Sequence, residues 1–206
     1  MSVVYILTNE SMPGYIKVGR TEREVTKRVV ELDNTAVPLP FQCYYAARVP
    51  DYEKVERALH VAFDDFRVRK NREFFKDLDP HRVKAILELL AEEDVTPREE
   101  IVIDAEATQA LEKAVRHTRR FSFASVGIPI GATLVFAKDS SKTCVVETDT
   151  SVVFEGESMS ISQAALRSLH DLGYRTPTAQ GTLYWLYNDE SLNFMRARLA
   201  NESASE

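Results

Sequence analysis

Four side chains in the N-terminal part of the chain are of the types that phosphodiester hydrolysis with one metal ion requires. They are a tyrosine, a lysine, an arginine and a glutamate: Tyr5, Lys17, Arg28 and Glu56. Such cleavage needs an activated water, a cation that stabilises the pentavalent phosphate, and help for the leaving 3′ oxygen. Because each residue type alone is also common in structural roles, the hypothesis depends on how the chain positions them.

The first two residues lie in short apolar runs typical of strands. Val3–Thr8 and Tyr15–Gly19 are separated by a polar connection that contains Pro13-Gly14, which predicts a hairpin. A further aromatic and β-branched run, Phe41–Val49, predicts a third strand.

The other two residues lie in segments typical of helices. Thr21, with Glu24 three residues later, has the spacing of a capping box and predicts the start of the helix that carries Arg28. Asp51 is the predicted cap of a helix that runs to about residue 66 and carries Glu56. His60 follows Glu56 by four residues and therefore shares its helical face.

In order and spacing these residues resemble the GIY-YIG nuclease superfamily over about residues 3–78. Val4-Tyr5-Ile6 stands where Gly-Ile-Tyr is expected, and Lys17-Val18-Gly19 where Tyr-Ile-Gly is expected. The chain looks closest to the phage and restriction-associated branch related to the meiotically up-regulated gene 113 family. In that branch the second strand reads Ile-Lys-Val/Ile-Gly-Arg-Thr and the tail carries Leu-His and then Arg-Glu-Phe-Phe, here Leu59-His60 and Arg72-Glu73-Phe74-Phe75.

The resemblance implies a role for each residue. Glu56 would ligate a single Mg²⁺ (or Mn²⁺) at the scissile phosphate. Tyr5 would hold and deprotonate the attacking water, for which the pKa of its phenol must fall from about 10. Arg28 would grip a non-bridging phosphate oxygen. The superfamily usually has tyrosine at the position of Lys17, although some restriction-type members carry lysine; an ammonium there favours the Tyr5 phenolate.

Plainer interpretations stand beside these roles. Tyr5 is also typical of a buried, hydrogen-bonded core tyrosine, and strand alternation also allows Lys17 to lie on a solvent face. Glu56 and Arg28 alone would be ordinary exposed helix residues. His60 fits either a contact to DNA or a second-shell water, or a core histidine.

DNA is the predicted partner, and five basic residues are the candidates to contact its backbone. They are Arg20, directly after Gly19, and the basic run Arg67, Arg69, Lys70 and Arg72, which is equally typical of a solvated face. The net charge of −6 gives no overall basic field, and residues 1–80 balance 13 Lys+Arg against 13 Asp+Glu. Positive charge must therefore be concentrated locally.

Composition also indicates the cellular setting. Cys43 and Cys144 share no motif with each other or with a histidine, so neither a disulfide framework nor a zinc site is expected. The N-terminus begins directly with a strand rather than a signal peptide, and no apolar run approaches the length of a membrane helix. We expect a cytoplasmic protein without membrane contact, and a homodimer is left open.

The character of the chain changes after the first half. We expect a nuclease-type domain over 1–94, a helical linker over 95–120 that includes Ala105–His117, and a second domain over 121–206. In the second domain, strands are expected over 127–136, 144–147, 151–154 and 183–187. A helix capped by Ser160 or Ser162 and closed by Gly173 is expected between the last two, and a tail helix over 191–200.

The second domain resembles the RAMA-like, restriction-associated modules over about residues 126–190. The shared residues are the strand from Gly131 to Leu134, the helix start from Ile161 to Ala165, and the segment from Gly181 to Trp185. The aromatic residues Tyr184, Trp185 and Tyr187 would form a stacking platform for a base, or Trp185 would fill a small core.

The sequence thus predicts an α+β fold throughout: a small antiparallel sheet flanked by helices, then a smaller β-meander with one helix. Two functions are considered. One is a Mg²⁺-dependent DNA endonuclease of restriction or anti-phage defence. The other is a catalytically inactive GIY-YIG module that binds DNA or a protein partner.

Overall fold

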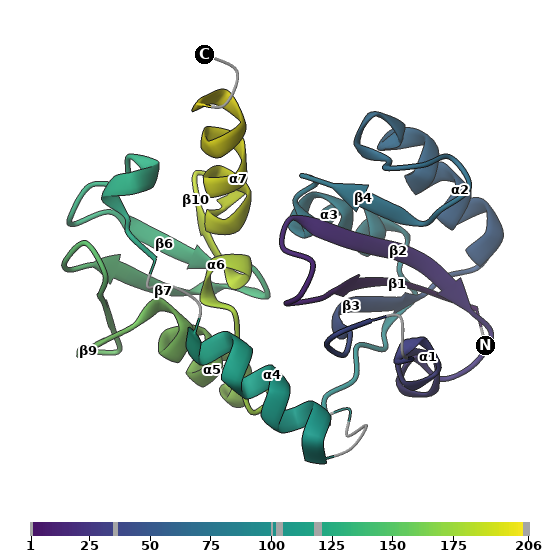
Figure 1. The fold of residues 1–206 in the computed structure, drawn as a ribbon, viewed down its shortest axis with the longest axis horizontal. Helices are drawn as coiled ribbons and strands as arrows, with labels where there is room; N and C mark the ends of the chain where they lie inside the picture. The colour runs from purple at the N-terminus through teal and green to yellow at the C-terminus, as the bar shows by residue number, and fades with distance from the viewer. Residues whose placement is uncertain (1, 35–36, 100, 102–104, 118–120, 204–206) are drawn as a thin grey trace. The chain divides into compact units, whose positions relative to one another are not determined.

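The computed structural model describes residues 2–34, 37–99, 101, 105–117 and 121–203. The chain divides into two compact units, Met1–Ala114 and Val115–Glu206. Each contains one antiparallel sheet with helices, so the predicted α+β fold is confirmed (Figure 1). Parts of the predicted 95–120 linker (100, 102–104 and 118–120) lie outside the described residues. Among the described residues, no helix has the length and apolar character to cross a membrane.

The first unit is built on a five-stranded sheet in the order β4-β2-β1-β3-β5. The central strand β1 pairs with β2 on one side, placing Tyr5 opposite Gly19, and with β3 on the other. The elements are β1 (Val3–Thr8), β2 (Tyr15–Thr21), α1 (Val25–Leu32), β3 (Gln42–Arg48), α2 (Tyr52–Ala62), a 3₁₀ turn (Asp64–Phe66), β4 (Phe74–Lys76), α3 (Pro80–Leu90), β5 (Glu93–Asp94) and α4 (Ala105–His117), which crosses the boundary between the units.

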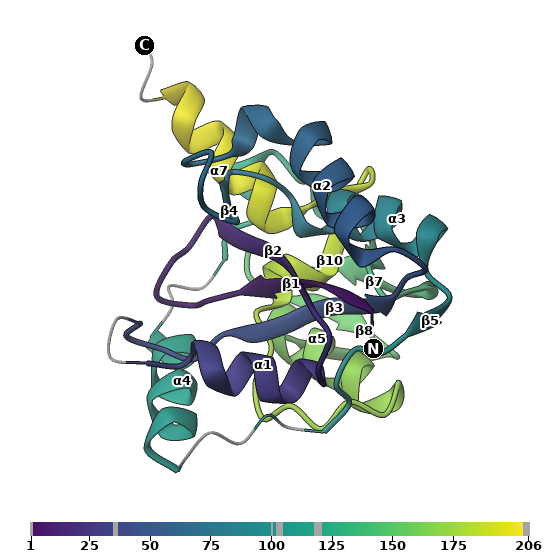
Figure 2. The same cartoon turned by 90° about the vertical axis from the view of Figure 1, so that its right-hand side faces the viewer.

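Helices cover both faces of this sheet (Figure 2). Alternate residues of β1, namely Val3, Tyr5 and Leu7, pack with Val25 and Val29 of α1. The opposite face is covered by α2 and α3, which contact β1 together with β2 and β3 respectively. Strand alternation therefore sends Tyr5 toward α1, and its neighbours in β1 toward the other two helices.

The first helix begins later than predicted. Thr21 is the last residue of β2, and α1 starts at Val25 after an N-cap, Glu24, that makes no side-chain cap. The Thr21 hydroxyl instead accepts a hydrogen bond from the Arg23 backbone N–H at 3.0 Å. The capping-box prediction is wrong because the strand keeps this threonine, buried at its end.

The second helix begins where predicted but ends earlier. The Asp51 carboxylate caps α2 by accepting from the Lys54 backbone N–H at 3.0 Å. The helix stops at Ala62, and a separate 3₁₀ turn follows it to Phe66. The predicted connector helix is present as α4.

The second unit has a six-stranded sheet in the order β11-β10-β6-β7-β8-β9. Its core joins the sheet to α5 and α7 around the fully buried Trp185. The elements are a 3₁₀ turn (Ala124–Val126), β6 (Thr133–Phe136), β7 (Asp139–Val146), β8 (Val152–Phe154), β9 (Glu157–Met159), α5 (Ile161–Asp171), α6 (Gly181–Tyr184), β10 (Trp185–Tyr187), β11 (Glu190–Ser191) and α7 (Leu192–Ser203).

Several details of this unit match the sequence prediction. Ser160 caps α5 with a capping box to Gln163, and Gly173 follows the helix at a φ of 84°. Several boundaries differ from the prediction: β7 begins already at Asp139, β6 begins only at Thr133, and the segment from Gly181 forms a helical turn before β10. That turn is packed tightly, because a Cβ on Gly181 would lie 2.5 Å from the Ile161 carbonyl.

Candidate functional site

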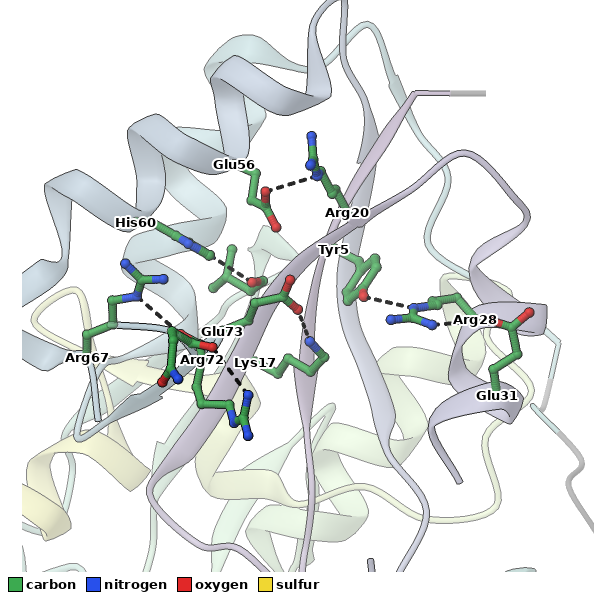
Figure 3. A network of polar contacts seen from close by, with 12 residues as sticks. Tyr5, Lys17, Arg20, Arg28, Glu31, Glu56, His60, Arg67, Arg72 and Glu73 are labelled. Carbon is green, nitrogen blue, oxygen red and sulfur yellow. Dashed lines mark hydrogen bonds and ion pairs between the residues drawn. The ribbon is translucent and has the colours of Figure 1, made fainter. Parts of the chain in front are cut away.

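The four residues with predicted catalytic roles, Tyr5, Lys17, Arg28 and Glu56, lie around the outer edge of β2. Strand β4 pairs only with Tyr15, Ile16 and Lys17. The Val18 N–H then donates to the Glu73 carbonyl at 3.0 Å, and no strand among the described residues pairs with this edge farther along. Side chains from β1, β2, α1, α2 and the residue before β4 surround the open edge (Figure 3). We call this the strand-edge site; it consists of Tyr5, Lys17, Arg20, Arg28, Glu56 and Glu73.

Tyr5 reaches the site because its cross-strand partner has no side chain. A Cβ on Gly19 would lie 2.7 Å from the Tyr5 hydroxyl and 2.8 Å from Cζ. The phenol ring therefore occupies the space that any larger residue would fill. This gives a physical reason for a glycine at the third position of the Lys17-Val18-Gly19 motif.

Two opposing effects act on the Tyr5 phenol. Burial raises its pKa above 10, because a phenolate would lose its hydration, and the Arg28 guanidinium acts in the opposite direction. Arg28 Nε donates to the hydroxyl oxygen at 3.4 Å, while its Nη1 forms an ion pair with Glu31 at 3.2 Å. The hydroxyl is thus coupled to a cation from α1, whereas the sequence hypothesis gave Arg28 a phosphate contact and gave the coupling with Tyr5 to Lys17. The net effect of burial and Arg28 still leaves the pKa of the phenol raised.

Lys17 does not lie on a solvent face. It is 5% exposed, and its ammonium forms an ion pair with the Glu73 carboxylate. Its Nζ lies 5.9 Å from the centroid of the Tyr5 ring and 5.6 Å from that of Phe74. The solvent-face alternative is therefore wrong, since this lysine is held inside the site.

Glu56 is likewise not an ordinary exposed helix residue. Its side chain is 12% exposed, and Oε2 accepts from Arg20 Nε at 3.2 Å. Arg20 also pairs with Glu53 at 2.6 Å, so the guanidinium bridges two carboxylates of α2. Burial first, and then the negative charge of Glu73, raise the pKa of Glu56.

His60 lies in the interior next to this carboxylate. It is 8% exposed, and its Nε2 lies 2.9 Å from the Val18 carbonyl, to which the neutral ring donates. The ring also meets Phe75 edge-on at 5.3 Å. Burial lowers the pKa of His60, which keeps the ring neutral. These contacts tie α2 to β2 and fit the core-histidine alternative.

A pocket of about 300 Å³ opens beside Glu56. Its lining is mostly charged and comes from the end of β2, one side of α2 and the following loop: Arg20, Glu53, Glu56, Arg57, His60, Val61 and Arg67. The three guanidinium groups of this lining outnumber its two carboxylates, Glu53 and Glu56, and the pocket is therefore suited to an anionic ligand. A carboxylate in the lining could hold a cation that the ligand also binds.

The predicted backbone contacts divide into two groups. Arg20 and Arg67 line the pocket, and Arg67 Nε donates to the Arg72 carbonyl at 3.2 Å. Arg69, Lys70 and Arg72 are exposed on the loop before β4 and do not line it.

The residues present fit a cation held by one carboxylate. Among the residues that the structure describes, no three His, Cys, Asp or Glu side chains gather into a metal cluster. A Mg²⁺ ion bound through one carboxylate, waters and a substrate phosphate does not need such a cluster. Glu56 has the required oxygen donor, but a cation there must compete with Arg20 for it.

The sequence hypothesis overlooked Glu73, Glu53 and Arg57. Glu73 matters most, because it neutralises Lys17 and faces both Tyr5 and Glu56. A signal was present: Glu73 lies in the Arg-Glu-Phe-Phe motif that contributed to the resemblance. The motif alone could not show that its carboxylate reaches Lys17, 56 residues away in the chain.

In the second unit, Trp185 is a core residue and not a stacking surface. It is fully buried between Phe136 and Phe154, with ring centroids at 5.1 and 5.7 Å. Tyr184 and Tyr187 are partly buried against the same core. The core alternative is thus confirmed, and a base cannot stack on this tryptophan without unfolding the unit.

Comparison with known proteins concerns the first unit. No curated protein and no solved structure matches the chain. The family model of the T5orf172 domain matches residues 2–91; this domain is linked to HNH and GIY-YIG-like nucleases of phage and defence systems. The match ends before the second unit, whose RAMA-like character stays a prediction. It includes β1 to α3 and every residue of the strand-edge site, so the segment that forms this site is similar to the T5orf172 domain.

Proposed function

We propose that the first unit is a metal-dependent DNA endonuclease that hydrolyses phosphodiester bonds at the strand-edge site, in restriction or anti-phage defence. One observation carries this proposal: Tyr5, Lys17, Arg28 and Glu56 come from four different elements and converge on one open strand edge. The similarity of residues 2–91 to the T5orf172 domain supports the same chemistry.

Each side chain has a task in this reaction. Tyr5, as phenolate, holds the attacking water and takes one of its protons as the water oxygen bonds to phosphorus. The bond between phosphorus and the 3′ oxygen breaks in the same displacement, and the leaving 3′ oxygen takes a proton from solvent water. Arg28 positions a phosphate oxygen and favours the phenolate. Arg20 leaves Glu56 when substrate enters and contacts the DNA backbone. A Mg²⁺ or Mn²⁺ ion at Glu56 would stabilise charge on the phosphate.

The decisive experiment is DNA cleavage by the full chain. We expect plasmid or branched DNA to be cut with Mg²⁺ or Mn²⁺ and to stay intact with EDTA. Glu56→Gln keeps the shape of the side chain but removes the charge that attracts a cation, so it should abolish cleavage while leaving the fold and most DNA affinity unchanged. Glu24→Gln is the matched control, because Glu24 is exposed and its carboxylate forms an ion pair with Lys27, which does not belong to the strand-edge site. Cleavage by Glu56→Gln at the wild-type rate would refute the site.

A second function, DNA or protein binding without cleavage, is favoured by two observations. Burial raises the pKa of Tyr5, the opposite of what a general base needs. Arg20 also occupies the carboxylate that a cation would use. This function predicts DNA affinity that is the same with metal or EDTA, with no cut product under any condition.

A further inference from the structure

The ion pair between Lys17 and Glu73 is built into the strand-edge site. The Glu73 backbone is fixed, because its carbonyl accepts from the Val18 N–H at 3.0 Å. Its carboxylate then reaches the ammonium of Lys17, whose side chain is 6% exposed against 40% for Glu73. A buried ammonium needs such a partner, since an unpaired charge in the interior is costly. In this pair, the backbone of Glu73 is held by β2, and the side chain of Lys17 is buried.

The buried Lys17 ammonium faces Tyr5: its Nζ lies 5.9 Å from the centroid of the ring, within the range of a cation–π contact. The charged groups that act on the Tyr5 hydroxyl are Arg28 of α1, Glu56 of α2 and Glu73 before β4. Lys17 of β2 lies over the ring of Tyr5 (Figure 3). Glu73 and Glu56 oppose the phenolate, whereas Arg28 favours it.

We propose that Glu73 is a positioning residue: its carboxylate fixes the Lys17 ammonium against the Tyr5 ring and so determines how strongly that positive charge acts on the hydroxyl. Lys17 is then not a mobile cation that turns to phosphate, but one half of a fixed pair. The inference deepens the proposed function and rests on it for its catalytic meaning. The geometric claim itself concerns only the protein and can be tested without DNA.

The test follows the ionisation of residue 5 alone. The chain has eight tyrosines, so 3,5-difluorotyrosine is placed at position 5 and its titration is followed by ¹⁹F NMR in the full chain, without metal or DNA. The fluorines make the phenol more acidic and bring its titration into the pH range of the folded protein. The titration midpoint of residue 5 is measured in four proteins. Two of them have Glu73, with either Lys17 or Lys17→Met, and the other two have Glu73→Gln, again with either Lys17 or Lys17→Met.

If Glu73 holds Lys17 in place, Lys17→Met raises the midpoint when Glu73 is present, because a cation that favours phenolate is lost. With Glu73→Gln the ammonium is free to move outward. Since Coulomb energy falls with distance, a move to about twice the distance should reduce the effect of Lys17→Met to roughly half or less. The proposal is overturned if Lys17→Met changes the midpoint equally with Glu73 and with Glu73→Gln, or if it changes the midpoint in neither protein.

A matched pair elsewhere in the unit provides the control. Lys84 and Glu88 of α3 form an ion pair at 2.7 Å with side-chain exposures of 7% and 46%, similar to those of Lys17 and Glu73. In a protein with Glu88→Gln, Lys17→Met should raise the titration midpoint of residue 5 by as much as it does with Glu88 present. If Glu73→Gln does not fold, Glu73→Asp replaces it: the charge is kept but set back by one methylene, and the effect of Lys17→Met should again shrink.

Cleavage kinetics separate this inference from the proposed function. Glu73→Gln should lower kcat with little change in KM, and Glu73→Asp should recover part of the loss, because the reacting group is affected and not the grip on DNA. An active wild-type enzyme whose titration shows no coupling refutes the role of Glu73 and leaves the nuclease. Coupled titrations in a chain that cleaves nothing support the fixed pair and refute the nuclease.

Discussion

The two units of the chain use their interiors differently. The first unit buries charged or titratable side chains, including Lys17, His60 and Lys84, and keeps Glu56 nearly covered. In the second unit, no Asp, Glu, Lys, Arg or His among the described residues is buried, and the buried polar side chains are those of Ser168, Thr182 and Ser191. Its interior is otherwise apolar and aromatic, around Trp185.

The difference indicates that the first unit, with its buried charged groups, is the one that carries a functional site. Buried charge lowers stability unless it is paired, and sites that must shift proton affinities are where it accumulates. In the first unit, burial changes the pKa of Tyr5, Glu56 and His60 within one site. In the second, the large shift is that of Cys144, whose pKa burial raises to about 12, which leaves an inert thiol.

The largest effect is expected from Tyr5→Phe, which removes the hydroxyl of the first unit's site. We expect the cleavage rate to fall by roughly a hundred- to ten-thousand-fold, as for loss of a general base. Thermal unfolding should change little, since only one long hydrogen bond of 3.4 Å is lost. Tyr15→Phe, at the start of β2, is the control and should cleave as wild type does. Equal losses in both variants would show that the site has been misplaced.

The corresponding change in the second unit is Trp185→Ala. Removing this fully buried ring should cost about 3–5 kcal/mol of unfolding free energy in that unit. Hydrogen exchange should show faster exchange in β6 and α5 and unchanged protection in β1 and α2. Tyr187→Ala, on the same strand but only partly buried, should cost less. Loss of protection in β1 as well would mean that the two units do not unfold separately.

A smaller effect is expected where the site meets the sheet. Gly19→Ala places a Cβ 2.7 Å from the Tyr5 hydroxyl, and this overpacking should cost about 1–3 kcal/mol and displace the phenol. In a Tyr5→Ala background the collision is absent, so the added cost should disappear. Denaturant unfolding of the four proteins gives this coupling directly. A cost that stays the same in both backgrounds would assign it to the backbone alone.

The smallest effect concerns pH. Because burial lowers the pKa of His60, the unfolded chain takes up the proton first as pH falls below 6.5. The stability contributed by the neutral ring is present above that pH and is lost as pH falls toward the lowered pKa. His60→Gln should flatten this part of the stability profile. His170→Gln is the control, since that ring also bonds a carbonyl, at 2.8 Å, but is exposed. An unflattened profile in His60→Gln would contradict the assignment.

Much of this architecture could be predicted from the sequence because local patterns determine it. Short apolar and β-branched runs predicted β1, β2 and β3, and Asp51 and Ser160 marked the starts of α2 and α5. The prediction that Thr21 caps α1 was wrong because a capping-box pattern does not reveal that β2 extends through this residue. Local patterns decide such boundaries only where tertiary pairing does not compete.

The site was less accessible to sequence reasoning. The four residues that match the superfamily pattern could be named from their order, but their partners could not. Glu73 reaches Lys17 only through the pairing of β4 with β2, and Arg20 reaches Glu56 only through the packing of α2 beside the strand. Both contacts depend on distant parts of the chain, so no local spacing predicts them.

The central position of β1 in its sheet has a consequence for folding during synthesis. All six residues of this strand are buried, and it lies in the centre of its sheet although it is synthesised before the other strands of that sheet. The hairpin to β2 can cover one edge early, but the other edge stays open until β3 has been synthesised. During that interval the nascent chain presents an apolar strand with unpaired backbone groups, which is a template for aggregation. Production of this protein should therefore be most sensitive to changes that delay the arrival of β3.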